Sequence, residues 1–141
     1  MITKEAQLSI ACVNGNFLDA EKLILENKNI INRDHLNLSI LKGSLDIVKL
    51  LLKNGADMTE DSLYYSCVSG VYDIVKFLID NGADCRKDKG EALDYACNKG
   101  FYDIVKLLIE NGAIVTHENL CTAAVKNHCK IVKLLLNKGV S

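Results

Sequence analysis

Residues 71–84 read VYDIVKFLIDNGAD, and close copies of this phrase occur elsewhere in the chain. With the residue before it, the phrase starts at Gly70; related segments start at Gly43 (GSLDIVKLLLKNGAD), Gly100 (GFYDIVKLLIENGAI) and Asn127 (NHCKIVKLLLNKGVS), and a weaker one at Gly15 (GNFLDAEKLILENKNI). We call these five starting residues the pivots; the intervals between them are 28, 27, 30 and 27 residues. Self-similarity at a nearly fixed period is typical of repeat proteins, so the sequence predicts five copies of one unit.

A second pattern precedes each pivot. A leucine lies seven residues before it in every copy: Leu8, Leu36, Leu63, Leu93 and Leu120. A small residue lies four before it: Ala11, Ser39, Ser66, Ala96 and Ala123. Offsets of three and four residues place side chains on one face of a helix. Each unit is therefore predicted to be a short helix, a turn at the pivot and a longer helix.

The dipeptide Asn81-Gly82 is typical of a β-hairpin turn. No alternating strand flanks it, however, and apolar residues at helical spacing precede it. Glycine adopts the left-handed conformation that ends helices at little cost. We therefore predict that the dipeptide ends a helix, with the stop residues at Gly55, Gly82 and Gly112. Within the same helix, Lys76 is predicted to pair with Asp73 in the first turn.

The composition excludes several classes of protein. The 141 residues are 49% apolar and 25% charged, as in a folded domain, and the net charge of −1 favours neither nucleic acid nor an anionic membrane as a partner. No apolar run approaches the ~18 residues of a membrane span. The start, MITKEAQLSIACVNG, lacks the apolar core of a secretory signal. We expect an intracellular, cytoplasmic protein.

Candidate reactive residues have simpler explanations. Cys12, Cys67 and Cys97 share one position among small residues facing a neighbouring helix, where a free thiol acts as a small hydrophobe. His117 and Cys121, and His128 and Cys129, are zinc-binding residue types, but the spacings of a four-ligand site are absent. No nucleophile motif or glycine-rich phosphate loop is present. We expect no enzyme activity, no metal and no cofactor.

The phrase DIVKLLLxNGAD, placed after a helix with an LxxAA or LxxSC pattern, resembles the ankyrin repeat. The resemblance implies an all-α solenoid of stacked helix-turn-helix repeats, one domain over residues 1–141, with repeats at approximately 5–30, 33–57, 60–84, 90–114 and 117–141. The period falls short of the family's usual ~33 residues, and the missing residues belong to its β-hairpin finger. Shortened or absent fingers are therefore expected, except around Cys85 to Gly90, which keeps a family-like Asp88-x-Gly90.

The resemblance also implies a function in binding another protein through the concave face, as a non-catalytic adaptor or inhibitor. In the family, two residues before each pivot and one ahead of each first helix line that face. By position these are Arg33, Leu41, Lys42, Glu60, Val68, Ser69, Asn98, Lys99, His117, Val125 and Lys126. The sequence leaves open whether Leu41, Val68 and Val125 instead turn inward under the shortened fingers.

The last repeat is as apolar as an interior one and does not look like a cap. Either the array belongs to a longer chain, or this end associates with a partner or with itself through Ile131, Leu134 and Leu135. The alternative function is thus a structural spacer or self-associating scaffold. Short repeats rich in Lys, Asn and Ile also look like those abundant in large DNA viruses and intracellular microbes, which implies a viral or microbial host-interaction protein.

Overall fold

A computed structural model describes residues 2–87 and 90–140, and within them the regular secondary structure is helical, without strands. The ten α-helices of this part follow one another in pairs. These are α1 (Lys4–Asn14) and α2 (Phe17–Glu26), α3 (Arg33–Leu41) and α4 (Leu45–Lys53), α5 (Ser62–Ser69) and α6 (Tyr72–Asp80), α7 (Glu91–Lys99) and α8 (Tyr102–Glu110), and α9 (His117–Val125) and α10 (Cys129–Asn137). A short 3₁₀ helix, η1 (Lys28–Ile30), follows α2. The predicted all-α architecture is confirmed.

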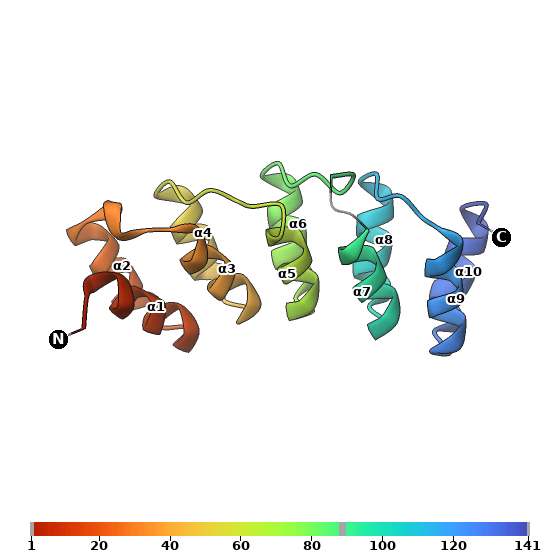
Figure 1. Cartoon of the computed structure of the whole chain (residues 1–141), viewed down its shortest axis with the longest axis horizontal. Helices are drawn as coiled ribbons and strands as arrows, with labels where there is room; N and C mark the ends of the chain where they lie inside the picture. Colours follow the sequence, from red (N-terminus) through yellow and green to blue (C-terminus); the bar gives the residue numbers. More distant parts are fainter. Residues whose placement is uncertain (1, 88–89, 141) are drawn as a thin grey trace.

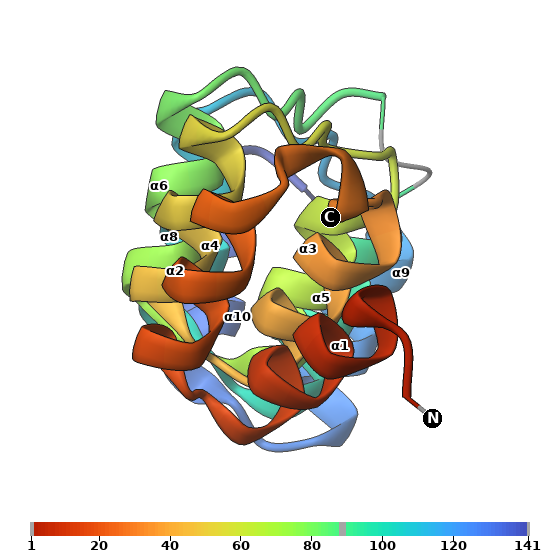
Figure 2. The same cartoon turned by 90° about the vertical axis from the view of Figure 1, so that its left-hand side faces the viewer.

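The pairs stand side by side in a row, with the chain termini at opposite ends (Figure 1). Seen along the row, the first helix of each pair belongs to one layer and the second to another (Figure 2). Consecutive first helices contact each other more extensively than consecutive second helices do. The row therefore curves, with the first helices on its inner, concave side. Leu23 and Leu135 belong to separate core clusters, as expected when burial comes only from adjacent units.

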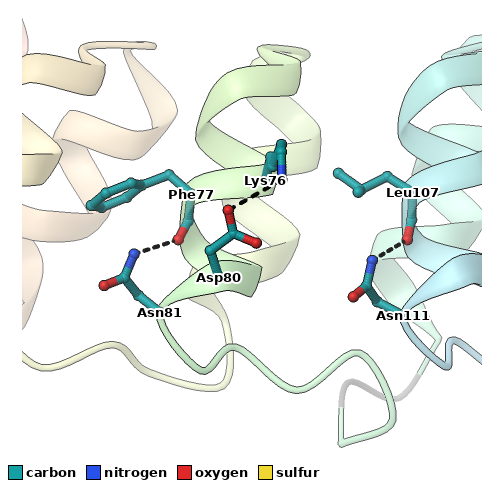
Figure 3. A network of polar contacts seen from close by, with 6 residues as sticks. All are labelled: Lys76, Phe77, Asp80, Asn81, Leu107 and Asn111. Atoms are coloured by element: carbon teal, nitrogen blue, oxygen red, sulfur yellow. Dashed lines mark hydrogen bonds and ion pairs between the residues drawn. The ribbon is translucent and has the colours of Figure 1, made fainter.

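The Asn-Gly dipeptides end helices, as predicted. Positive φ angles occur at all three stop positions, Gly55, Gly82 and Gly112. The asparagine has a role that the sequence did not indicate: the Asn81 side-chain amide donates to the Phe77 carbonyl at 2.8 Å, and the same bond joins Asn111 to Leu107 (Figure 3). The backbone N–H of the same asparagine also donates to that carbonyl, at 3.1 Å for Asn81 and 3.2 Å for Asn111, so the side chain adds a second hydrogen bond at the helix end.

The ion pair predicted within α6 has a different partner. Lys76 Nζ lies 3.2 Å from Asp80 Oδ2, one turn onward, rather than beside Asp73 (Figure 3). Both side chains are more than half exposed, so solvent screens the pair and its contribution to stability is small. The equivalent residue of the preceding repeat, Lys49, instead lies over the ring of Phe77, 5.5 Å from its centroid. Lysines at this position can therefore reach the next repeat.

Cys12, Cys67 and Cys97 are fully buried, which confirms the prediction that they fill the space between helices. The six cysteines all lie among the described residues, and none of them forms a disulfide. Burial, reinforced by the charge of Asp94, raises the pKa of the Cys97 thiol to about 12. Burial also raises the pKa of Cys12, against the opposing effect of a hydrogen bond with Ser39. Both thiols stay protonated at neutral pH, a state unsuited to nucleophilic attack or metal binding.

The connections between repeats are short, and those that the structure describes contain no hairpin strands, as the short period predicted. The segment expected to keep more of a finger forms a turn over residues 85–87, and Gly90, with φ of +84°, precedes α7. Asp88, part of the predicted Asp88-x-Gly90 motif, lies outside the described residues.

Neighbouring first helices are also joined by polar contacts. Three buried polar side chains occupy the same position, eight residues before their pivots: His35, Ser62 and Asn119. His35 Nε2 lies 3.0 Å from the Glu5 carbonyl oxygen. Ser62 Oγ donates to Asn37 Oδ1 at 2.9 Å, and the Asn119 amide donates to the Asp94 carboxylate. Since buried polar groups need specific partners, these contacts fix how one repeat sits on the next.

Candidate protein-interaction surface

The residues predicted to bind a partner all belong to first helices or flank them. Arg33 and His117 begin α3 and α9, and Glu60 lies just before α5. The others lie at the opposite ends of the first helices: Leu41, Lys42, Val68, Ser69, Asn98, Lys99, Val125 and Lys126. A nine-residue helix is about 13 Å long. The predicted residues therefore form two rows at opposite edges of the concave face.

The three apolar residues of this set differ in their exposure to solvent. Val125 is 79% exposed and Leu41 is 37% exposed, whereas Val68 is half-buried. The three lysines of the same row, Lys42, Lys99 and Lys126, are exposed. The row that ends the first helices thus presents cations and some apolar surface to solvent.

Two predicted residues also take part in local structure. Ser69 Oγ donates to the Ser66 carbonyl at 2.6 Å and accepts from the Val71 amide at 3.3 Å. The Ser69 hydroxyl therefore stabilises the end of α5. The carbonyl oxygen of Asn98 lies 2.9 Å from His128 Nε2, which ties α7 to the last repeat. The Asn98 side chain belongs to the exposed surface.

Sites of other kinds are not indicated by the described residues. His117 Nε2 lies 3.3 Å from Cys121 Sγ, but in the part of the chain that the structure describes no group of three or more metal-ligating side chains is arranged around one point. Over residues 2–87 and 90–140, none of the helices has the length and apolarity needed to span a bilayer.

The middle of the concave face carries aromatic residues that sequence reasoning did not select as a site. Tyr64 of α5 and Tyr95 of α7 meet edge to face, with ring centroids 5.9 Å apart and planes at 79°. Tyr65 lies beside Tyr64, at 5.8 Å, and Phe101 beside Tyr95, at 6.4 Å. The rings are half-buried and form a continuous strip across the third and fourth repeats. The four residues are visible in the sequence, but the contact between Tyr64 and Tyr95 depends on the stacking of the two repeats.

A shallow groove accompanies these rings. It has a volume of about 460 Å³ and is lined by Tyr64, Glu91, Asp94, Tyr95 and Asn98. Glu91 and Asp94 lie in the first turn of α7 and are exposed, while Lys99 is at the other end of the helix. The concave face is therefore acidic where this first helix begins and basic where it ends, an arrangement that the helix dipole favours.

The residues predicted for self-association are mostly unsuited to it. Ile131 is 1% exposed and Leu135 is 0% exposed, because both pack into the core of their own chain, and Leu134 is half-buried. The prediction that Ile131 and Leu135 form an outer surface is wrong. Their counterparts in the fourth repeat, Ile104 and Leu108, are buried in the same way.

The last repeat nevertheless exposes a face whose equivalent in each earlier repeat is covered by the following repeat. Ala124 is exposed, whereas the equivalent residues of the four earlier repeats, Cys12, Ile40, Cys67 and Cys97, are each 0% exposed. Leu120 and Val132 are half-buried, although their interior counterparts are buried. We call Leu120, Ala124 and Val132 the C-terminal end face. It is the surface on which a following repeat would stack.

The outer face of the first repeat is different. A groove of about 350 Å³ lies between α1 and α2 and is lined largely by polar side chains, among them Gln7, Asn14 and Asp19. Lys4 of α1 forms an ion pair with Glu26 of α2, with 3.3 Å between Nζ and Oε2. Polar outer faces are what terminal repeats of a solenoid require. The two ends of the array therefore differ in character.

Comparison with known proteins agrees with this architecture. A family model described as ankyrin repeats (3 copies) matches residues 36–119 and, in a second alignment, residues 63–141. The chain belongs to the ankyrin-repeat family. Ankyrin repeats are generally protein–protein interaction modules and are typically non-catalytic.

This ankyrin-repeat protein is also similar to a solved structure, the crystal structure of the human ASB11 ankyrin repeat domain. The TM-score is 0.80 and the sequence identity 24%, over 95% of this chain and 69% of the other. At that identity the likeness shows the fold alone. Comparison with curated protein sequences gave no significant match.

Proposed function

We propose that this ankyrin-repeat protein is a non-catalytic adaptor or inhibitor that binds another protein through its concave face. The observation that supports this is the exposed row at the ends of the first helices: Lys42, Asn98, Lys99, Val125 and Lys126. Exposed apolar and charged side chains side by side suit a protein interface with a polar rim. The fold does not need this combination, since an apolar side chain such as Val125 gains nothing from exposure to water.

We further propose that the protein works in the cytoplasm. Six cysteines that form no disulfide suit a reducing compartment, where thiols do not oxidise to disulfides. The likeness of its short repeats to those abundant in large DNA viruses and intracellular microbes extends the proposal to a binding partner that belongs to a host cell.

Reversing the charge of the row tests the proposal. We expect the variant Lys42→Glu, Lys99→Glu, Lys126→Glu to lose partner capture from the native cell by about tenfold or more, because attraction to the partner becomes repulsion. The matched control is Lys22→Glu, Lys53→Glu, Lys106→Glu, which makes the same change in net charge on exposed residues of second helices. Capture is measured by quantitative mass spectrometry. Equal capture by the two variants would contradict a concave binding surface.

As a second candidate function, we propose self-association through the C-terminal end face. This rests on the exposure of Ala124 where the equivalent residues of the other repeats are buried. Sedimentation equilibrium is expected to give an average mass that rises with concentration for the wild type, and a constant monomer mass for Ala124→Arg. Leu25→Arg, at a side chain that is 76% exposed near the other end, should behave as the wild type. A wild-type chain that stays monomeric at high concentration would eliminate this candidate.

A further inference from the structure

The groove at the centre of the concave face combines two features that attract a cation. Its walls include the rings of Tyr64 and Tyr95, contributed by neighbouring repeats. Its rim includes the carboxylates of Glu91 and Asp94, both on the first turn of α7. An aromatic face and a carboxylate each stabilise a bound cation.

The chain itself shows that these rings accept cations. Lys99 Nζ lies 5.7 Å from the centroid of the Tyr95 ring, approaching from the end of the same helix. Across the second and third repeats, Lys49 lies in the same way over Phe77. Positively charged side chains thus pack against aromatic rings in this array.

The charges around the groove also favour a positively charged ligand. Glu60 and Asp61 precede α5 and are exposed, so the edge of the concave face beside the groove carries four carboxylates, at residues 60, 61, 91 and 94. Lys99 is the basic residue that approaches the strip from the opposite end of α7. A negatively charged ligand would be repelled by this edge, whereas a positively charged one would be attracted to it.

Asp94 is held in position for this role. Its carboxylate accepts a hydrogen bond from Asn119, a buried side chain of the next repeat. The carboxylate is therefore oriented from α9 while remaining exposed to solvent. Because the bond runs between repeats, the orientation of Asp94 depends on the stacking of the fourth and fifth repeats.

We propose that this groove binds an arginine side chain from a basic segment of the protein partner. The planar guanidinium can stack against a tyrosine ring and pair with a carboxylate through its fork of N–H donors, which suits a site with both features better than an ammonium does. The inference rests on the proposed function, since it assigns the partner chemistry to part of the same concave face.

The first test uses a synthetic Gly-Ser peptide carrying several arginines and the same peptide with glutamine in their place. Each is titrated into the full chain labelled with ¹⁵N. We expect the arginine peptide to shift the amide signals of residues 64, 91, 94, 95 and 98, and the glutamine peptide to leave them in place. Equal shifts with both peptides, or shifts spread over all acidic residues, would overturn the proposal.

The second test uses variants that keep the fold. Tyr64→Leu removes an aromatic face and keeps an apolar side chain, and Asp94→Asn removes a charge and keeps an acceptor for Asn119. Each is expected to weaken arginine-peptide binding by about two- to fivefold. Asp57→Asn, which changes an exposed carboxylate on the connection between α4 and α5, should bind as the wild type. Thermal unfolding of each variant is measured to check that the fold is retained. Unchanged affinity in both groove variants would refute the site.

Partner capture separates failure of this inference from failure of the proposed function. If the lysine-reversal variant loses the partner while Tyr64→Leu and Asp94→Asn keep it, the concave face binds but the groove does not contribute, and the inference is wrong. If the groove variants lose the partner too, the inference stands together with the proposed function. If all variants capture equally, the proposed function itself fails.

Discussion

Replacing Leu78 with alanine lowers the free energy of unfolding by about 2–5 kcal/mol. Leu78 lies in α6 and is 0% exposed. Alanine would remove buried apolar surface and leave a cavity that the packed helices around it cannot fully close. An ordinary domain is stable by about 5–15 kcal/mol in total, so the loss is a large fraction of the whole.

The position of Leu78 in the array adds to its effect. The third repeat joins the two core clusters: Leu78 belongs to the cluster of the N-terminal repeats, and Val75 of the same helix belongs to the cluster of the C-terminal repeats. In a solenoid, stability is approximately a sum of the repeats and their nearest-neighbour contacts. We therefore expect amide hydrogen exchange to accelerate more in α4 and α6 than in α10.

Urea unfolding followed by circular dichroism measures the loss. Leu25→Ala is the matched control, since it makes the same chemical change in α2 at a side chain that is 76% exposed. Its effect should stay within about 0.5 kcal/mol, as for other surface substitutions. Similar losses in the two variants would mean that burial within the stack does not determine stability here.

The repeated phrase was sufficient to predict the helix pairs, their order and the way they stop. Local chemistry sets each of these features: apolar residues at helical spacing form the buried face, and glycine ends the helix. The buried position of Leu78 and the helix stop at Gly82 could therefore be predicted from one copy of the phrase. The other copies repeated the same evidence. Contacts within one repeat are local, and local patterns are what a sequence displays most directly.

Contacts between repeats were harder to predict because they depend on stacking. His35, Ser62 and Asn119 occupy one position, but each is a different residue type. The partners of Ser62 and Asn119, Asn37 and Asp94, share a position six residues before their pivots, whereas His35 contacts the backbone carbonyl of Glu5. No motif marks such a series. The groove of Tyr64 and Asp94 was missed for the same reason, since its walls come from two repeats.

The C-terminal surface shows an error that the sequence could have prevented. High apolarity suggested Ile131 and Leu135 as an outer face, yet apolarity alone does not tell which side of a helix is outward. Comparison with equivalent residues shows which side is inward. Leu108, the counterpart of Leu135, is buried in the core that its repeat shares with the neighbouring repeats. The residues left uncovered are those whose counterparts face the next repeat, such as Ala124.

Gly100→Ala is the second variant with a large expected effect. Gly100 ends α7 with φ of +79°, and a Cβ added there would lie 2.5 Å from His128 Cε1, closer than side-chain carbon atoms approach. The His128 ring cannot move away freely, since its Nε2 lies 2.9 Å from the Asn98 carbonyl oxygen. The variant combines left-handed strain of about 1–2 kcal/mol with loss of this contact, about 0.5–1.5 kcal/mol more.

Gly82→Ala separates these two causes. Gly82 has φ of +102°, and an added Cβ would meet nothing within 4 Å, so this control carries the backbone strain alone. We expect urea unfolding to show a loss of about 1–2 kcal/mol for Gly82→Ala and a larger one for Gly100→Ala. Equal losses would mean that the His128 ring moves aside without cost.

A double-mutant cycle then locates the clash. His128→Ala alone loses the contact with Asn98, but in the background of Gly100→Ala it also removes the obstacle to the new methyl group. The double variant should therefore be more stable than the sum of the two single losses predicts, because residues in contact couple. Strict additivity would show that the strain lies in the backbone. Coupling would show that the pivot glycine is required here by the histidine of the following repeat, so that one repeat constrains the sequence of its neighbour.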